Sequence, residues 1–161
     1  MSQAKKVFTR MCLNNWGGID HKVLEFHEYV NLFSGKSGSG KSTVMDAIQV
    51  ILYGSFSPSF LNKAADDAKN RRSVLSYLRG EQKDGSANRK DCDFCSVIAL
   101  EIEDTGTHII TCIGIAFEVR KSDSEIKKFV YFSHSGKMPE SEYLTEQGLS
   151  LIHISEPTRP Y

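Results

Sequence analysis

The sequence predicts an α/β fold in which an amino-terminal β-hairpin leads into a glycine-rich loop, an amphipathic helix and an antiparallel β-meander. Three observations predict it. Apolar runs with strand-like alternation stand on both sides of the loop, three glycines fall within residues 35–40, and apolar residues at helical spacing follow directly. With 161 residues, of which 40% are hydrophobic and 25% charged, the chain is long enough to bury one core.

The charge balance restricts the partners that the whole chain attracts. Lysine and arginine number 20 and aspartate and glutamate number 20, so any contact with DNA or anionic lipid must be local. The longest nearly unbroken apolar run, residues 109–117, has about half the length of a membrane-spanning helix. The first residues lack the apolar core of a signal peptide. We therefore expect a cytoplasmic protein with no membrane partner.

The amino-terminal region predicts a hairpin. Residues 7–14 and 23–33 have strand-like composition, and Trp16-Gly17-Gly18 between them supplies a turn. A helix is expected after the glycine-rich loop, with Gly54 as its carboxyl-terminal cap. The apolar residues that recur at helical spacing are Val44, Ala47, Ile48 and Ile51. The polar residues expected on the opposite, unpacked side are Ser42, Asp46 and Gln49.

The second half of the chain predicts short helices followed by strands. Residues 64–79 favour one or two short helices, and a polar loop follows at 81–93. The strand candidates are residues 96–103, 107–119 and 126–133. Because Asp104-Thr105-Gly106 has the composition of a hairpin turn, an antiparallel meander is the simplest arrangement.

One pair of cysteines has the spacing found in metal-binding and redox motifs. Cys92 and Cys95 form a single C-x-x-C pair, whereas Cys12 and Cys112 stand alone. A structural zinc site needs four ligands, and the sequence has neither a second such pair nor a His-x3-5-His partner. Reduced structural thiols are therefore favoured over zinc or redox chemistry.

Residues 35–42, GKSGSGKS, fit the pattern G-x-x-x-x-G-K-[ST] between an apolar segment and a helix. Glycines let the backbone curl into a nest of N–H donors, and the helix amino end adds about half a positive charge. A flexible Gly/Ser linker is the alternative, but a linker does not require lysine and serine at these positions. The pattern predicts a P-loop that binds phosphate.

The motif assigns a role to each candidate residue, with ATP and Mg²⁺ as the expected cofactors. Lys41 would reach the β and γ oxygens, the Ser42 hydroxyl would be a ligand of Mg²⁺, and Thr43 would add a phosphate contact. The predicted binding residues are Gly35, Lys36, Ser37, Gly38, Ser39, Gly40, Lys41, Ser42 and Thr43. A small P-loop kinase is disfavoured, because some thirty residues precede the loop and a meander replaces parallel βα repeats.

The chain resembles the N-terminal half of an ABC-type ATPase head, as found in SMC-like proteins. GSGKSTVMDAIQVILYG, residues 38–54, looks like the SMC-family P-loop helix, and LNNWGGI, residues 13–19, is similar to the MukB-like branch. FLNKAADDAKNRRSVLSYLRG, residues 60–80, resembles the corresponding segment of Wadjet JetC-type ATPases. The resemblance covers roughly residues 7–133. RecF-like or SbcC-like repair ATPases remain the alternative, because the loop does not separate them.

This resemblance implies an ATP-driven machine that organises or excludes DNA, with a second ATPase head, coiled coils, non-SMC subunits and DNA as partners. JetC-type complexes act against plasmids. A basic stretch offers either a local DNA contact or, as we favour, a solvated surface with interspersed acids. Its residues are Lys63, Lys69, Arg71, Arg72, Arg79, Lys83, Arg89 and Lys90.

An ABC-type site also needs an Asp-Glu pair after four apolar residues and a signature loop, and the sequence contains neither. VIALEIED, residues 97–104, is the nearest imitation, but its acids alternate with apolar residues as on a strand. Gln82 and Gln147 are possible water-sensing glutamines without an assignment. No catalytic residue is therefore predicted, and the chain is expected to bind ATP without hydrolysing it alone.

The sequence of the carboxyl-terminal tail indicates an origin different from that of residues 1–148. LSLIHISEPTR, residues 149–159, is similar to a translation of the mosaic end and adapter of transposase-based sequencing libraries. A short terminal strand at 151–154 is the alternative. We expect residues 1–148 to be the N-terminal half of the head, residues 149–161 to derive from the adapter, and the parent gene to continue past Gly148.

Overall fold

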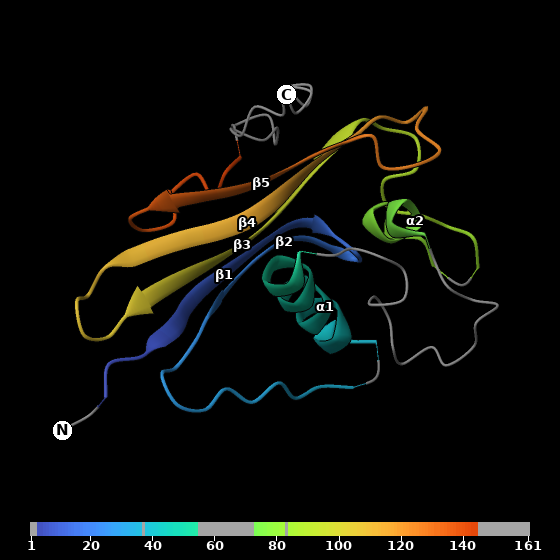
Figure 1. The fold of residues 1–161 in the computed structure, drawn as a ribbon. Helices are drawn as coiled ribbons and strands as arrows, with labels where there is room; N and C mark the ends of the chain where they lie inside the picture. Colours follow the sequence, from blue (N-terminus) through green and yellow to red (C-terminus); the bar gives the residue numbers. More distant parts are fainter. Residues whose placement is uncertain (1–2, 37, 55–72, 83, 145–161) are drawn as a thin grey trace, which may run out of the picture.

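The structure, a computed structural model, describes residues 3–36, 38–54, 73–82 and 84–144. Within them, five strands form one antiparallel sheet in the order β2-β1-β3-β4-β5, and two helices lie on one face of it (Figure 1). The strands are β1 (Lys6–Trp16), β2 (Ile19–Glu25), β3 (Phe94–Asp104), β4 (Ile110–Val119) and β5 (Lys128–Ser135). The helices are α1 (Lys41–Tyr53) and α2 (Val74–Leu78).

The predicted amino-terminal hairpin is confirmed, but its second strand ends early. Trp16 pairs with Ile19 across a two-residue turn, and β2 ends at Glu25 instead of reaching residue 33. The Asn31 side chain accepts a hydrogen bond from the His27 N–H (2.7 Å) and donates one to the His27 carbonyl (2.9 Å). Because these are the groups that a continuing strand would use for pairing, residues 27–31 form no strand.

The predicted meander is also confirmed, with strand ends that differ from the predicted ones by no more than three residues. β3, β4 and β5 pair in sequence order, and the Asp104 carboxylate accepts the N–H groups of Gly106 (2.9 Å) and Thr107 (3.1 Å) in the turn. β1 pairs with β3, with Leu13 opposite Ile98, and thereby joins the hairpin to the meander. The chain thus has the expected α/β composition.

Alternation along the central strands places apolar side chains on both faces of the sheet. The face under the helices holds the larger residues, and the opposite face holds small residues that Met138 and Tyr143 cover. Fully buried residues under the helices include Met11, Leu13, Leu100, Ile115 and Phe117. The buried small residues of the opposite face are Cys12, Val97, Ala99, Cys112 and Ala116.

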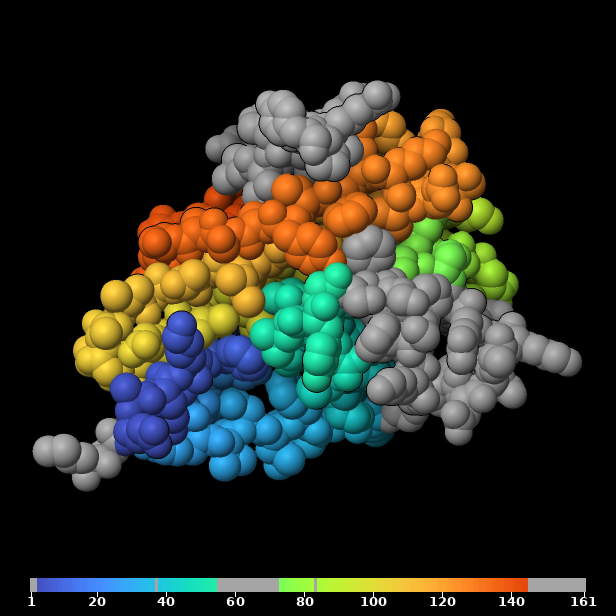
Figure 2. Space-filling model, viewed as in Figure 1, coloured from blue at the N-terminus to red at the C-terminus, as the bar shows by residue number. Residues whose placement is uncertain are grey.

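Helix α1 begins and ends as the sequence predicts. Gly54 adopts a left-handed conformation (φ 63°) and donates its N–H to the Val50 carbonyl at 3.0 Å. The helix buries one face on the sheet and shows the other to the outside, with the amino-terminal strands on one side and β4 and β5 on the other (Figure 2). Neither α1 nor α2 is long and apolar enough to cross a membrane.

The predicted exposure of Asp46 is wrong. Its residue surface is 6% exposed, and its carboxylate accepts a hydrogen bond from the Tyr77 hydroxyl at 3.4 Å. Tyr77 belongs to α2, which begins after Ser73, whose side chain accepts the Ser76 N–H at 3.1 Å. The short helix therefore covers the flank of α1 that its own sequence pattern leaves polar. Most of the region predicted as helical, residues 64–72, lies outside the described residues.

Candidate functional site

The glycine-rich loop leads directly into the amino end of α1. Gly40 is the helix cap with φ 92°, a left-handed conformation that favours glycine. A side-chain carbon added at Gly35 would lie 2.5 Å from the Ser39 hydroxyl oxygen, so any larger residue at this position would have to displace the Ser39 side chain. The Ser39 N–H donates to the Lys36 carbonyl at 3.1 Å and closes the loop. Ser37 lies outside the described residues.

The amino end of α1 is prepared for an anion. The helix has no side-chain hydrogen bond at its cap and no acidic residue in its first turn. The first N–H groups of a helix have no partner within the helix, and the helix dipole makes this end positive. The end therefore presents N–H donors and a partial positive charge to the space beside the loop.

The Lys41 ammonium group lies within the loop. It donates hydrogen bonds to the Gly35 carbonyl, to the Lys36 carbonyl at 2.9 Å and to the Ser39 hydroxyl at 3.3 Å. An ammonium group is a compact cation with three donors, suited to phosphate oxygens. The structure thus brings the lysine of the motif to the cradle that its glycines form.

The remaining predicted ligands stand in the first turn of α1. Ser42 is exposed, and Thr43 is half-buried beside the hairpin turn. A hydroxyl is a hard oxygen ligand of the kind that Mg²⁺ prefers. The tight closure at Gly35, the Lys41 cation and the uncapped helix end fit a nucleotide phosphate, with Ser42 available to its Mg²⁺.

Trp16 positions the glycine-rich loop, a role that the P-loop motif does not predict because Trp16 lies outside the motif. Its side chain is fully buried, and its Nε1–H donates to the Thr43 carbonyl at 2.9 Å. Its ring meets the ring of Tyr77 edge-on at 4.9 Å. Trp16 therefore fixes the first turn of α1 to the hairpin. The available signal was a large aromatic residue, the chain's sole tryptophan, directly before a glycine pair.

Neither role considered for the basic stretch, a DNA contact or a solvated surface, holds for Arg89. Its side chain is 7% exposed and donates to the carbonyls of Leu78 (2.9 Å) and Gly17 and to the Asp20 carboxylate (2.7 Å). Burial lowers the pKa of the Arg89 guanidinium, although Asp20 opposes this shift. Because its donors are used internally, Arg89 braces α2 against the hairpin turn and offers no contact to DNA.

Two further residues of the basic stretch, Arg79 and Lys90, lie within the described residues. Arg79 donates to three backbone carbonyls, those of Arg120 and Lys121 (each 3.2 Å) and of Asp123 (2.9 Å). Lys90 is exposed. The residues outside the described ranges are Lys63, Lys69, Arg71, Arg72 and Lys83.

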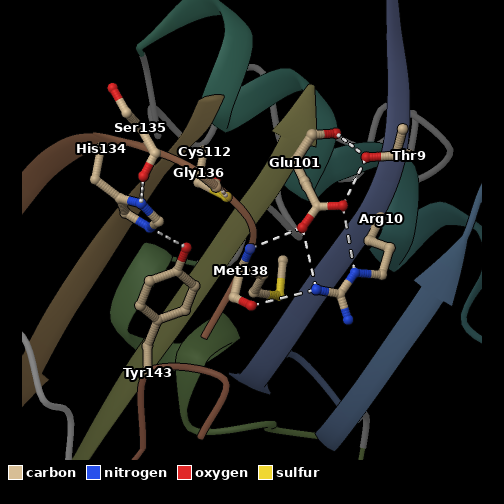
Figure 3. A network of polar contacts seen from close by, with 9 residues as sticks. All are labelled: Thr9, Arg10, Glu101, Cys112, His134, Ser135, Gly136, Met138 and Tyr143. Atoms are coloured by element: carbon tan, nitrogen blue, oxygen red, sulfur yellow. Dashed lines mark hydrogen bonds and ion pairs between the residues drawn. The ribbon is translucent and has the colours of Figure 1, made fainter. Parts of the chain in front are cut away.

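The acids of β3 serve the fold. Glu101 is buried and accepts hydrogen bonds from the Thr9 hydroxyl (2.8 Å), Arg10 Nη2 (3.0 Å) and the Met138 N–H (2.7 Å; Figure 3). Burial alone would raise the pKa of Glu101, but the hydrogen bonds from Arg10, Met138 and Thr9 outweigh it and lower the pKa below its ordinary value. This carboxylate is therefore committed to an internal network.

The other candidate groups carry no assignment. All four cysteines are free thiols, with Cys92 exposed and Cys95 half-buried. Gln82 donates to the Gly80 carbonyl at 3.4 Å, which indicates a turn contact. Gln147 and the tail at 149–161 lie outside the described residues, so the adapter origin stays a prediction.

Two likenesses to known proteins agree with this geometry. Residues 8–68 match the family described as the P-loop containing region of the AAA domain. The chain is 39% identical over 74 residues to the C subunit of nuclease SbcCD from Staphylococcus haemolyticus (strain JCSC1435), an alignment that covers 44% of this chain and 6% of that protein. The chain thus spans a small part of that relative's length. Residues 8–68 thus resemble a P-loop region, and the described residues form an α/β fold.

Proposed function

We propose that the chain binds ATP with Mg²⁺ through residues 35–43, as the nucleotide-binding part of an SMC- or SbcC-like ATPase that acts on DNA. The observation that carries this proposal is the position of the Lys41 ammonium, inside the loop and ahead of an uncapped helix end. A cation, N–H donors and a helix dipole converge there, and the negatively charged phosphate groups of ATP suit such a site.

Each loop residue has a role in this proposal. Lys41 binds the β and γ oxygens, and the N–H groups of the loop and of the first helical turn bind the remaining phosphate oxygens. Ser42 offers its hydroxyl as one ligand for Mg²⁺, which neutralises phosphate charge when bound. Thr43 adds a contact while Trp16 holds its carbonyl and thereby orients the turn.

Hydrolysis requires groups beyond this loop. Phosphoryl transfer needs a residue that positions water and donors that stabilise the developing charge. The sequence offers no Asp-Glu pair after an apolar run and no signature loop, and Glu101 is committed to its own network. We therefore propose that turnover depends on a further polypeptide segment and on a second ATPase head.

Two kinds of DNA-acting complex are candidates. The identity to the C subunit of nuclease SbcCD supports an SbcC-like repair ATPase that works with a nuclease partner. The resemblance of residues 60–80 to JetC-type proteins supports an SMC-like complex that organises chromosomes or excludes plasmids, with non-SMC subunits. The genes beside the parent gene distinguish these alternatives, because each complex has its own partner proteins.

Replacing Lys41 with alanine is expected to weaken ATP binding roughly 10- to 150-fold, because a hydrogen bond to a charged group contributes about 1.5–3 kcal/mol. Calorimetric titration of the full chain with ATP and MgCl₂ measures this change. Wild-type affinity is expected to be modest, since the loop residues contact only the phosphates.

Lys137→Ala is the matched control for that titration. Lys137 is exposed and follows β5, so its replacement removes the same charge far along the chain from the loop. Its affinity for ATP is expected to match that of the wild type. If Lys41→Ala bound ATP as tightly as the wild type, Lys41 would not be part of the binding site. If Lys41→Ala and Lys137→Ala lost affinity equally, the loss would come from the change in net charge and not from a contact of Lys41.

A further inference from the structure

The sheet face opposite α1 brings a thiol, an imidazole and a carboxylate together. Cys12 and Asn14 lie two residues apart on β1, and His21 on β2 pairs directly with Asn14. Glu142 reaches the same place from the segment that follows β5. One ligand atom from each of Cys12, His21 and Glu142 lies within 4.8 Å of the others.

Hydrogen bonding fixes the proton on the His21 ring. The Glu142 carbonyl only accepts, so the Asn14 Nδ2 that lies 2.8 Å from it must donate. The other end of the same amide, Asn14 Oδ1, therefore faces His21 Nδ1 and accepts from it. With the proton on Nδ1, the neutral imidazole carries its lone pair on Nε2.

That lone pair faces a second acceptor. His21 Nε2 lies 2.5 Å from Glu142 Oε2, the separation of a hydrogen bond in which a proton lies between the two atoms. A proton satisfies the pair alone, as in an ion pair. A divalent metal, whose ligand atoms stand about 3.3 Å apart in a tetrahedral site, would displace this proton, move the two atoms slightly apart and also bind the nearby Cys12 sulfur. Among the described residues, that sulfur contacts Asn14 Nδ2 at 3.3 Å and the Glu142 carbonyl at 3.8 Å.

We propose that Cys12, His21 and Glu142 form a binding site for a divalent metal of the zinc type. A set of one sulfur, one nitrogen and one oxygen ligand suits zinc, with bond lengths of about 2.0–2.3 Å and a fourth position open to water. Zinc deprotonates a coordinating thiol, so Cys12 releases its proton to solvent on binding.

The surroundings of this site have the features of a metal site. Asn14 orients the imidazole through Nδ1, as outer partners of metal-binding histidines do. The His21 side chain is 49% exposed and that of Glu142 is 26% exposed, which leaves a path from solvent.

Titration of the full chain with ZnCl₂ and with CoCl₂, under a reductant that does not bind metals, tests this site. We expect one Zn²⁺ per chain by calorimetry, and with Co²⁺ an absorption band from thiolate-to-cobalt charge transfer. His21→Gln should weaken Zn²⁺ binding more than about 100-fold, because even residues that only orient a ligand contribute about 10- to 100-fold. Glu142→Gln, which leaves both β1 and β2 intact, should also weaken it.

Two controls match these variants. His108→Gln alters another imidazole–carboxylate pair, in which His108 Nδ1 lies 2.8 Å from Glu103, and Cys92→Ser removes an exposed thiol. Both should bind Zn²⁺ as the wild type does. A chain that is folded by circular dichroism but gives no thiolate–cobalt band would overturn the proposal. So would loss of binding in Cys92→Ser with retention in His21→Gln and Glu142→Gln.

Discussion

Replacing Trp16 with alanine is expected to lower the free energy of unfolding by about 3–5 kcal/mol, the range for deleting a buried aromatic side chain. Trp16 is fully buried between the hairpin, α1 and α2, and stacks near Phe117 at 6.3 Å. The substitution also removes the donor to the Thr43 carbonyl, which is 2.9 Å away. Urea unfolding measures this change in free energy. It is followed by circular dichroism instead of tryptophan fluorescence, because Trp16 is the one tryptophan of the chain and the variant has none.

Tyr53→Ala is the control for this substitution. Tyr53 is 74% exposed at the end of α1, so its loss is expected to change stability by less than about 0.5 kcal/mol. Trp16→Phe keeps much of the ring packing and loses the hydrogen bond, and an intermediate effect is expected. If Trp16→Ala cost no more than Tyr53→Ala, Trp16 would not be the residue that joins α1 to the sheet.

Replacing Glu101 with glutamine is expected to lower the free energy of unfolding by about 2–4 kcal/mol at neutral pH. Removing one partner of a buried ion pair costs about 3–5 kcal/mol, and the exposure of Arg10 reduces this. The Glu101 side chain is 5% exposed and that of Arg10 is 31% exposed. The glutamine of the variant has one acceptor oxygen, and its amide nitrogen is a donor. This nitrogen would therefore face at least one other donor among the Thr9 hydroxyl, the Arg10 guanidinium and the Met138 N–H, which leaves that donor without an acceptor.

The lowered pKa of Glu101 determines how its contribution to the free energy of unfolding changes with pH. A carboxylate with a lowered pKa in the folded state stabilises the fold fully above its unfolded pKa, about 4.3, and loses this contribution as the pH falls toward the folded pKa. The difference between wild type and Glu101→Gln should therefore be constant from about pH 6 to 8 and shrink below about pH 4.

Glu103→Gln is the control on the same strand. Glu103 pairs with the largely exposed His108, a surface contact that contributes about 0–1 kcal/mol. A small effect is expected at every pH. A Glu101→Gln variant as stable as Glu103→Gln, or a difference that grows on acidification, would contradict the assignment of Glu101 as the carboxylate that fastens Met138 to the sheet.

Local patterns were sufficient for most elements of the fold. The glycine pair after Trp16 specifies a two-residue hairpin, the spacing from Val44 to Ile51 specifies α1, and Gly54 specifies its end, because each signal acts within a few residues. The end of β2 depends on an equally local feature, the Asn31 side chain bound to the His27 backbone. Strand composition does not report such a side-chain contact, so the predicted strand extended too far.

Contacts between distant segments explain what sequence reasoning missed. Asp46 is polar in the helical pattern, yet Tyr77 buries it from 31 residues away. Arg89 belongs to a charged loop, yet its guanidinium reaches carbonyls of α2 and of the hairpin turn. The loop residues around Lys41 were identified because phosphate binding requires their types at fixed spacing. The residues that hold the loop in place carry no such pattern.

The most direct test of the central claim is an amide NMR titration of the full, isotope-labelled chain with ATP and MgCl₂. We expect the largest shifts on Gly35, Gly38, Gly40 and the first turn of α1, with smaller shifts at Trp16, whose indole donates to the Thr43 carbonyl. The amides of β4 and β5 should change little. Shifts centred on another surface, or saturating ATP without any effect on residues 35–43, would contradict the assignment of this loop as the nucleotide site.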